Sequence, residues 1–261
     1  MNDILHKIIA TKRDELAHDK QVRPLEYLLD KIAEHAYTPR PMCEALAASP
    51  SGIIAEFKRR SPSKGWINAD ADPATIARAY TAGGATAMSV LTDATYFGGS
   101  RADFRQVRAT TSLPLLRKEF IIDPYQLYVS ATLRADAVLL IASALERSQC
   151  AELAALAREL GLQTLLEIHT ADELAYLTPD ITMLGVNNRH LGSFHTDPAV
   201  SLELASALPE GKVCVAESGL SHPAQVRSLR EAGFRGFLMG EHFMRQADPE
   251  AALREFVSQI S

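Results

Sequence analysis

The sequence has few cysteines and no long hydrophobic run, and each shortage excludes a class of protein. Its three cysteines, Cys43, Cys150 and Cys214, are far apart and show neither CxxC spacing nor grouping with histidines. This argues against a disulfide framework and against a zinc site. No apolar stretch approaches the roughly 20 residues that a membrane-crossing helix needs, so we expect no membrane partner. Charged residues interrupt the opening segment, which predicts no secretion signal and a cytoplasmic protein.

The sequence also lacks an excess of basic charge. Its 27 lysines and arginines are outnumbered by 32 aspartates and glutamates, which leaves a formal net charge of −5. Such a chain has no overall positive field to attract nucleic acid or an anionic membrane, so any anionic ligand must be bound by local groups. At 261 residues, 47% of them hydrophobic, the chain has the composition of a globular protein. Barrels of alternating strands and helices commonly occupy this length.

Two kinds of segment follow one another along the chain. The spacing of apolar residues predicts an amphipathic helix from Ile4 to about His18, and a second helical stretch follows to Ala48. Eight short apolar runs then come at intervals typical of βαβ units, each followed by a helix-like stretch. The runs span residues 52–58, 85–92, 113–118, 137–143, 163–167, 183–187, 212–217 and 236–240.

These repeats predict a closed (β/α)8 TIM barrel with an N-terminal helical extension. We expect a single domain over residues 1–261, with the extension at 1–48 and the barrel at 52–261. An open doubly wound sheet is the competing architecture. The sequence shows neither a Gly-x-Gly-x-x-Gly turn after the first apolar run nor a Walker motif, and either would favour that alternative.

Charged and amide side chains stand at the ends of the predicted strands, where a barrel binds its ligands. They are Glu56, Lys58, Lys118, Glu167, Asn187, Arg189, Glu217 and Ser218. Alternation along a strand turns Glu56 and Lys58 to the same side and lets Lys118 face inward. Ion pairing at the rim is the structural alternative, but contributions from five predicted strands favour an active site.

Glycines at the ends of the last two predicted strands indicate a phosphate site. Gly219 and Gly240 leave backbone N–H groups open to an anion, at the usual place for phosphate in a barrel. Ser61 and Lys64, after the first strand, would cover it, although this loop can equally be a solvated turn. Apolar residues near the strand ends, which in many barrels only close the top, predict one wall of the site. They are Phe97, Phe120, Leu191 and Leu238.

Several segments resemble those of the indole-3-glycerol phosphate synthase family. They are residues 54–65 (IAEFKRRSPSKG), 89–93 (SVLTD), 116–123 (LRKEFIID), 185–189 (GVNNR) and 216–219 (AESG). The resemblance implies conversion of 1-(2-carboxyphenylamino)-1-deoxyribulose 5-phosphate to indole-3-glycerol phosphate in tryptophan biosynthesis, with release of carbon dioxide and water. It implies a carboxy-lyase without a cofactor, and the histidines show no spacing typical of a metal site.

The resemblance also implies which residues transfer protons. Lys118 is the general acid that protonates the ketone during ring closure, and Lys58 holds the substrate carboxylate or assists dehydration. Glu167 is the second acid/base residue, with Glu56 and Glu217 in support. Neighbouring lysines lower each other's pKa, which would help Lys118 to release its proton near neutral pH.

The remaining matched residues are implied to bind substrate. Asn187 forms hydrogen bonds and Arg189 orients charge, and the phosphate binders are Ser61, Ser218, Gly219 and Gly240. The expected partner is a small phosphorylated molecule. We expect a monomer, with association with other tryptophan-pathway enzymes left open.

Three positions depart from the family pattern. Glu119 and His190 stand where aspartate is common, and Val129 stands where glutamate is frequent. None is a proposed proton-transfer residue, so we expect effects on ion pairing and stability rather than on activity.

Three alternatives stay open at this point. Phosphoribosylanthranilate isomerase is another phosphosugar barrel, but it would need a cysteine and an aspartate as its acid/base pair. A Schiff-base aldolase would need only a buried lysine, which Lys118 could supply. A catalytically silent phosphate-binding scaffold is the alternative that is not an enzyme.

Overall fold

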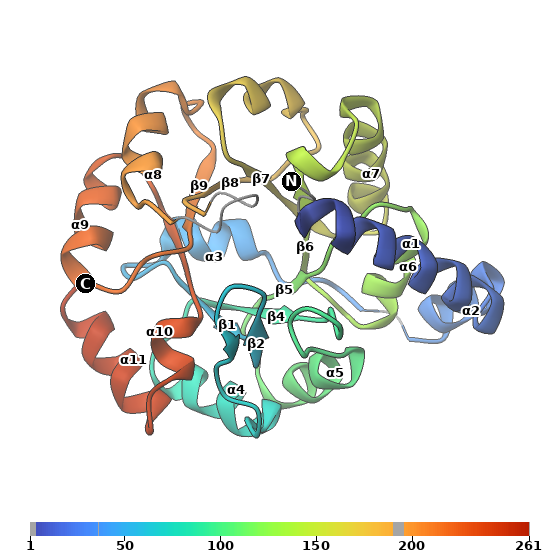
Figure 1. Cartoon of the computed structure of the whole chain (residues 1–261), viewed down its shortest axis with the longest axis horizontal. Helices are drawn as coiled ribbons and strands as arrows, with labels where there is room; N and C mark the ends of the chain where they lie inside the picture. The colour runs from blue at the N-terminus through green and yellow to red at the C-terminus, as the bar shows by residue number, and fades with distance from the viewer. Residues whose placement is uncertain (1–3, 36, 190–195, 261) are drawn as a thin grey trace.

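Eight parallel strands close into a barrel in the computed structural model of the chain, which describes residues 4–35, 37–189 and 196–260. Each strand pairs with the next along the chain, and the last pairs with the first, with Ile54 opposite Leu238. The strands are β1 (Ile53–Phe57), β4 (Ala87–Leu91), β5 (Leu115–Lys118), β6 (Ala137–Ile141), β7 (Gln163–Ile168), β8 (Met183–Asn187), β9 (Val213–Glu217) and β10 (Gly236–Met239). The predicted TIM barrel is confirmed (Figure 1).

Helices surround the barrel and cover its outer face (Figure 1). Those that follow strands are α4 (Pro73–Ala82), α5 (Arg101–Thr110), α6 (Tyr125–Thr132), α7 (Arg147–Glu159), α8 (Ala199–Leu204), α9 (Pro223–Glu231), α10 (Glu241–Met244) and α11 (Pro249–Ser258). Short 3-10 helices are η1 (Ala142–Ala144), η2 (Ala171–Tyr176) and η3 (Ala205–Ala207). A small hairpin of β2 (Arg60–Ser61) and β3 (Gly65–Trp66) lies in the first loop.

One of the predicted repeats differs from the expected pattern. Between β7 and β8 the described chain forms η2 instead of an α-helix. A capping box of Thr170 and Glu173 starts this short helix. Pro179 follows soon afterwards, and proline disfavours helical conformation in the residue before it, here Thr178, so the segment stops after six residues.

Alternation along the strands separates two buried clusters. Inward side chains such as Ile54, Leu116 and Leu165 fill the barrel, whereas outward side chains such as Phe57 and Met88 pack with the helices. Because the strands are short, this interior packing stops below their carboxyl ends. The inward positions at those ends carry the polar residues that the sequence indicated.

Three helices precede the barrel: α1 (Ile4–Val22), α2 (Leu25–Glu34) and α3 (Met42–Ala48). Helix α3 lies at the amino ends of the strands, because the Cys43 N–H donates to Gln163 Oε1 at the start of β7, at 2.8 Å. Its Met42 and Leu46 are fully buried in the interior cluster. Helix α1 lies at the opposite end and beside α6 (Figure 1), with an ion pair between Lys20 and Asp123 at 2.7 Å.

Shortening a buried side chain of α3, which covers the amino ends of the strands, should lower stability without changing turnover. Leu46→Ala removes a fully buried side chain, so we expect the free energy of unfolding to fall by about 2–5 kcal/mol. The turnover number below the unfolding temperature should not change, because α3 lies at the end opposite the strand ends where the site is expected. Urea unfolding and an activity assay would check this.

Glu44→Ala, on the exposed side of the same helix, is the matched control, with an expected change within about 0.5 kcal/mol. An equal loss of stability in both variants would contradict the role of Leu46.

Candidate active site

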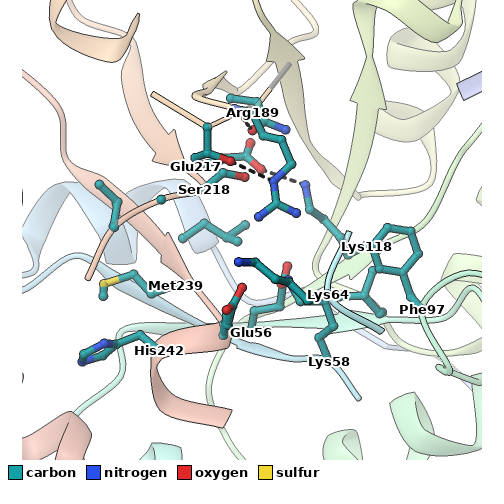
Figure 2. Close-up of a pocket in the computed structure, with 18 of the residues that line it drawn as sticks. Glu56, Lys58, Lys64, Phe97, Lys118, Arg189, Glu217, Ser218, Met239 and His242 are labelled. Atoms are coloured by element: carbon teal, nitrogen blue, oxygen red, sulfur yellow. Dashed lines mark hydrogen bonds and ion pairs between the residues drawn. The ribbon is translucent and has the colours of Figure 1, made fainter. Parts of the chain in front are cut away.

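A cavity of about 490 Å³ opens at the carboxyl ends of the strands. Figure 2 shows charged side chains pointing into it from several strands and loops. The predicted residues that line it are Glu56, Lys58, Phe97, Lys118, Phe120, Glu167, Asn187, Arg189, Glu217, Ser218, Gly219, Leu238 and Gly240. Most of the residues that the sequence suggested for one site therefore line one cavity.

Lys118 sits at the end of β5 between two carboxylates. Its Nζ lies 2.9 Å from Glu167 Oε2 and 2.7 Å from Glu217 Oε2, and both carboxylates are buried. Adjacent Arg117 points outward instead and donates to Gln126 O and Ser130 Oγ, at 3.0 Å each. Alternation along β5 thus selects Lys118 for the cavity and Arg117 for the outer layer.

A glycine makes room for one of these carboxylates. A Cβ atom on Gly185 would lie 2.2 Å from Glu217 Oε1, closer than atoms can approach. Glu217 therefore occupies the space above the backbone of β8 that any other residue at position 185 would fill. Oxygen Oε1 of Glu217 is buried and has no hydrogen-bond donor among the described residues.

The carboxylates keep Lys118 protonated. Burial lowers the pKa of Lys118, but Glu167, Glu217 and Glu56 more than offset this and raise it well above its ordinary value. The expectation that a second lysine would lower the pKa of Lys118 was therefore wrong. Lys58 is paired with Glu56 at 2.5 Å, and carboxylates, not cations, are the close neighbours of Lys118.

The two glutamates beside Lys118 differ in their protonation. Burial raises the pKa of Glu167, but Lys118 and His169 outweigh it, so the net shift is downward and Glu167 is ionised. Burial is the main cause that raises the pKa of Glu217, to about 7; Lys118 opposes this rise, whereas the charge of Glu167 adds to it. Near neutral pH, Glu217 is therefore partly protonated, whereas Glu167 is ionised and can accept a proton from a ligand.

Glu56 is fixed by close packing as well as by charge. A Cβ atom on Gly240 would lie 2.7 Å from Glu56 Oε1, so glycine at this position leaves room for the glutamate that pairs with Lys58. A substitution at Gly240 would therefore displace Glu56 in addition to any effect on a bound anion.

Asn187 and Arg189 extend the site along β8 and the loop that follows it. Asn187 Nδ2 donates to Glu167 Oε1 at 3.0 Å, and Asn187 Oδ1 accepts from the Arg189 N–H at 3.0 Å. Arg189 also donates to Thr196 Oγ1 at 3.1 Å and to Ser63 Oγ at 3.2 Å. Arg189 thus connects this loop to the loop after β1.

Not all expected phosphate binders face the cavity. Ser218 and Gly219 line it, with positive φ angles of 67° and 75°. Ser61 is buried outside the lining, and its Oγ accepts the Lys64 N–H at 3.2 Å. Lys64, which was expected there together with Ser61, does line the cavity, and a role of Ser61 in phosphate binding stays a prediction.

Apolar side chains form another part of the cavity lining. The rings of Phe97 and Phe120 have centroids 6.0 Å apart, and Leu238 lies on the same lining. Leu191, the fourth predicted member, lies outside the described residues. The cavity lining also includes Leu91 at the end of β4 and Leu139 and Ile141 of β6, which were not predicted. Their alternation with outward residues was visible, but neither strand ends in a charged residue that would have marked it.

The chain is similar over nearly its whole length to proteins of one known family. Residues 5–256 match the model of the family described as "Indole-3-glycerol phosphate synthase". A protein of that name from Bacteroides thetaiotaomicron is 53% identical over 260 residues and covers 100% of both chains. Another from Bordetella pertussis is 43% identical, covering 99% of this chain and 100% of its own.

The chain belongs to the indole-3-glycerol phosphate synthase family. The resemblance found in the sequence is thereby confirmed, and with it a carboxy-lyase of tryptophan biosynthesis. A thiamine phosphate pyrophosphorylase from Pyrococcus furiosus shares the fold, with a TM-score of 0.60 and 13% identity over 81% of this chain and 96% of that one.

The departures from the family pattern have a structural basis where the structure describes them. Glu119 is buried and lies 3.0 Å from Lys12 and 3.3 Å from Arg117, so it retains the charge of an aspartate. Val129 is buried in the outer cluster with α6. His190 lies outside the described residues.

Further residues of the cavity were missed at its rim. They include Thr196, Ser221, Glu241, His242, Arg245 and Gln246, which belong to loops or to the short helix α10. Of these, only Glu241 follows a predicted strand closely enough for the sequence to indicate it. Within residues 4–35, 37–189 and 196–260, no group of three His, Cys, Asp or Glu side chains is placed to hold a metal ion. Over the same ranges, no helix is long and apolar enough to cross a membrane.

The raised pKa of Glu217 predicts a pH-dependent contribution to stability. A carboxyl whose pKa rises on folding, here from 4.5 to about 7, stabilises the fold below pH 4.5 and loses this effect as the pH rises through 7. The stability of the wild type relative to Glu217→Gln should fall by up to about 3 kcal/mol between about pH 5 and about pH 8. Urea unfolding at both pH values measures this difference.

Glu34→Gln, in α2 and outside the site, is the control for this measurement. The Lys31 ammonium lowers the pKa of Glu34, so the contribution of this carboxylate is present above pH 4.5 and is lost only at lower pH. Its effect should hardly change between the same two pH values. A Glu217→Gln difference that stays constant, or grows with pH, would contradict the assignment.

Proposed function

We propose that the chain closes the indole ring, with Lys118 as general acid and an ionised Glu167 as general base. The observation that supports these roles is the ammonium of Lys118, held by Glu167 and Glu217 in a cavity with an apolar wall on one side. The substrate, 1-(2-carboxyphenylamino)-1-deoxyribulose 5-phosphate, has an aromatic ring, a carboxylate, a ketone and a phosphate. The cavity offers complementary groups to each of these.

Ring closure needs a proton at the ketone oxygen. The ring carbon that carries the carboxylate attacks the ketone carbon, and the ketone oxygen takes a proton from Lys118 Nζ. The bond to the carboxylate then breaks, carbon dioxide leaves, and its electron pair restores the aromatic ring. The substrate itself is the electron sink, so this step asks of the protein only a proton donor and correct placement.

Dehydration needs one base and one acid. A base removes a proton from the carbon next to the amine nitrogen, and the hydroxyl group leaves as water with a proton from an acid. Glu167 is the ionised carboxylate beside Lys118, which suits it to accept the first proton. We assign the second proton to Lys58, which is paired with Glu56 on the cavity lining.

The remaining lining residues are assigned to the carboxylate, the aromatic ring and the phosphate of the substrate. Arg189 and Lys58 are cations on the lining and suit the substrate carboxylate. Phe97, Phe120 and Leu238 form the slot for the aromatic ring, and Leu191 is proposed as its fourth member. The phosphate is assigned to Ser218 and the backbones of Gly219 and Gly240, with Ser61 as a further binder.

Other features of the enzyme belong to the same proposal. We place it in the cytoplasm, where tryptophan is made from soluble intermediates, and treat residues 1–261 as one domain. We also propose that it acts as a monomer. Association with other tryptophan-pathway enzymes stays a prediction.

A Schiff-base aldolase is a weaker candidate for this cavity. Attack on a carbonyl requires a neutral amine, and the pKa of Lys118 is raised, not lowered. The isomerase alternative needs a catalytic cysteine, but Cys43, Cys150 and Cys214 do not line the cavity.

The two lysines should separate in their effects on catalysis and binding. Lys118→Met removes the acid and keeps an apolar stem, so the turnover number should fall at least about 100-fold, with a smaller change in affinity. Lys58→Met should lower turnover too, because it removes the proposed acid of the dehydration step, and should in addition weaken binding by about 1.5–3 kcal/mol, because the substrate carboxylate loses its cation. The indole fluorescence of the product gives turnover, and competition by the substrate reduced at its ketone, which keeps the carboxylate but cannot react, gives affinity.

Thermal unfolding serves as the control for both variants, since Lys118→Met leaves two buried carboxylates without their cation. Near wild-type turnover of a folded Lys118→Met would contradict its role as the acid. Loss of turnover without any loss of affinity in Lys58→Met would contradict its role in binding.

A further inference from the structure

A buried lysine of the N-terminal helix connects two loops of the active site. Lys12, in α1, is 4% exposed. Its Nζ lies 3.0 Å from Asp93 Oδ2 and 3.0 Å from Glu119 Oε1, and 2.6 Å from Glu15 Oε2 of its own helix. Asp93 follows β4 and Glu119 follows β5, so one ammonium group bridges the loops after two neighbouring strands.

Asp93 holds the part of its loop that carries Phe97. Its Oδ1 accepts the N–H groups of Tyr96 at 2.7 Å and Phe97 at 3.2 Å. Its Oδ2 has no hydrogen-bond donor among the described residues, and the ion pair with Lys12 is its charged contact. The position of this carboxylate, and with it the backbone of Phe97, thus depends on Lys12.

Glu119 holds the backbone of Phe120 in the same way. Its Oε1 accepts the Phe120 N–H at 3.0 Å, and its Oε2 accepts from Thr92 Oγ1 at 2.7 Å. Phe97 and Phe120 contact each other and line the cavity. Each ring of the apolar wall is therefore attached to a carboxylate that the same lysine contacts.

We infer that Lys12 is a positioning residue for the aromatic part of the substrate, because it fixes the separation of Phe97 and Phe120 through Asp93 and Glu119. This inference rests on the proposed function, which places the aromatic ring at that wall. Helix α1 would then contribute to substrate binding, although Lys12 itself does not line the cavity.

The charges of the cluster support this role. Burial lowers the pKa of Lys12, but Glu119 and Asp93 more than offset it and raise it above its ordinary value, so Lys12 stays charged. Without Lys12, Glu119 keeps Arg117 as a partner, at 3.3 Å, whereas Asp93 would be a buried carboxylate without a cation. An isolated buried charge draws in water or moves toward it, which would displace the Phe97 loop.

Lys12→Met tests the inference when its affinity for ligands that contain an aromatic ring is compared with its affinity for a ligand that lacks one. We expect the KM for the substrate to rise about tenfold while kcat stays within about threefold, as expected when binding shared by ground state and transition state is lost. Inhibition by indole-3-glycerol phosphate should weaken by a similar factor. Inhibition by ribulose 5-phosphate, which has a ketone and a phosphate but no aromatic ring, should not change.

Two further variants control for a general loss of structure. Lys20→Met removes the other lysine that joins α1 to the barrel, through the exposed pair with Asp123, and should leave both inhibition constants unchanged. Lys12→Met/Asp93→Asn removes the uncompensated charge and keeps the Oδ1 acceptor, so it should recover part of the lost affinity. If Lys12→Met does not fold, this double variant takes its place, with a smaller but still ring-dependent loss expected.

Equal weakening of both inhibitors, or the same effect in Lys20→Met, would overturn the inference. So would an unchanged affinity for indole-3-glycerol phosphate in folded Lys12→Met. Failure of the proposed function is a separate result, because the wild type would then not form indole-3-glycerol phosphate from the substrate. The ratio of the two inhibition constants would still measure whether Lys12 positions Phe97 and Phe120.

Discussion

The contact between the ammonium of Lys118 and the carboxylates of Glu167 and Glu217 is the interaction on which the rest of the site depends. Burying three ionisable groups would be unfavourable unless each is compensated, and here a single cation compensates two acids. The arrangement keeps Lys118 charged, Glu167 ionised and Glu217 partly protonated. One cluster thereby offers a proton donor and a proton acceptor at the same pH.

The barrel provides this cluster with both support and space. Short strands bring residues from β5, β7 and β9 to one level, because their inward positions alternate with outward ones. Gly185 and Gly240 then leave room beside the barrel wall for Glu217 and Glu56. Helix α3 closes the opposite end, so the apolar interior below the charged cluster is isolated from water. Buried apolar contacts thus close the amino ends of the strands, whereas the charged groups of the cavity lie at their carboxyl ends.

The extension before the barrel serves both ends of the molecule. Met42 and Leu46 of α3 complete the interior, whereas α1 reaches the loops at the carboxyl ends of the strands. Through Lys12, α1 contacts the two loops that carry Phe97 and Phe120. One of these contacts is with Glu119, the residue that follows Lys118. The N-terminal extension therefore contributes to the active-site end of the barrel as well as to its stability.

Sequence patterns predicted the barrel and most of the cavity because both depend on local alternation. The two-residue period placed Glu56, Lys58 and Lys118 inside, and strand-end positions indicated Glu167 and Glu217. Contacts between distant segments were not predictable in this way: a helical pattern in α1 gave no sign that Lys12 would meet Asp93 and Glu119.

Electrostatics and short loops were predicted less well than strands. The predicted direction of the pKa shift of Lys118 was wrong because the shift depends on which charges lie nearest. The sequence placed a second lysine and several glutamates at the strand ends, but it did not show that the glutamates lie closest to Lys118. Ser61 was expected at the cavity, but the hairpin of β2 and β3 turns its hydroxyl toward Lys64. Such details depend on a few dihedral angles in the first loop, which no periodic pattern specifies.

The charge of the Lys118 ammonium is the central claim, and nitrogen NMR on protein labelled with 15N-lysine tests it most directly. A Lys118→Arg variant would assign the Nζ resonance by its disappearance. The account predicts the chemical shift of an ammonium throughout the range from about pH 6 to about pH 9, because two carboxylates stabilise the charged form. A resonance that titrates to the neutral amine near pH 7 would contradict it.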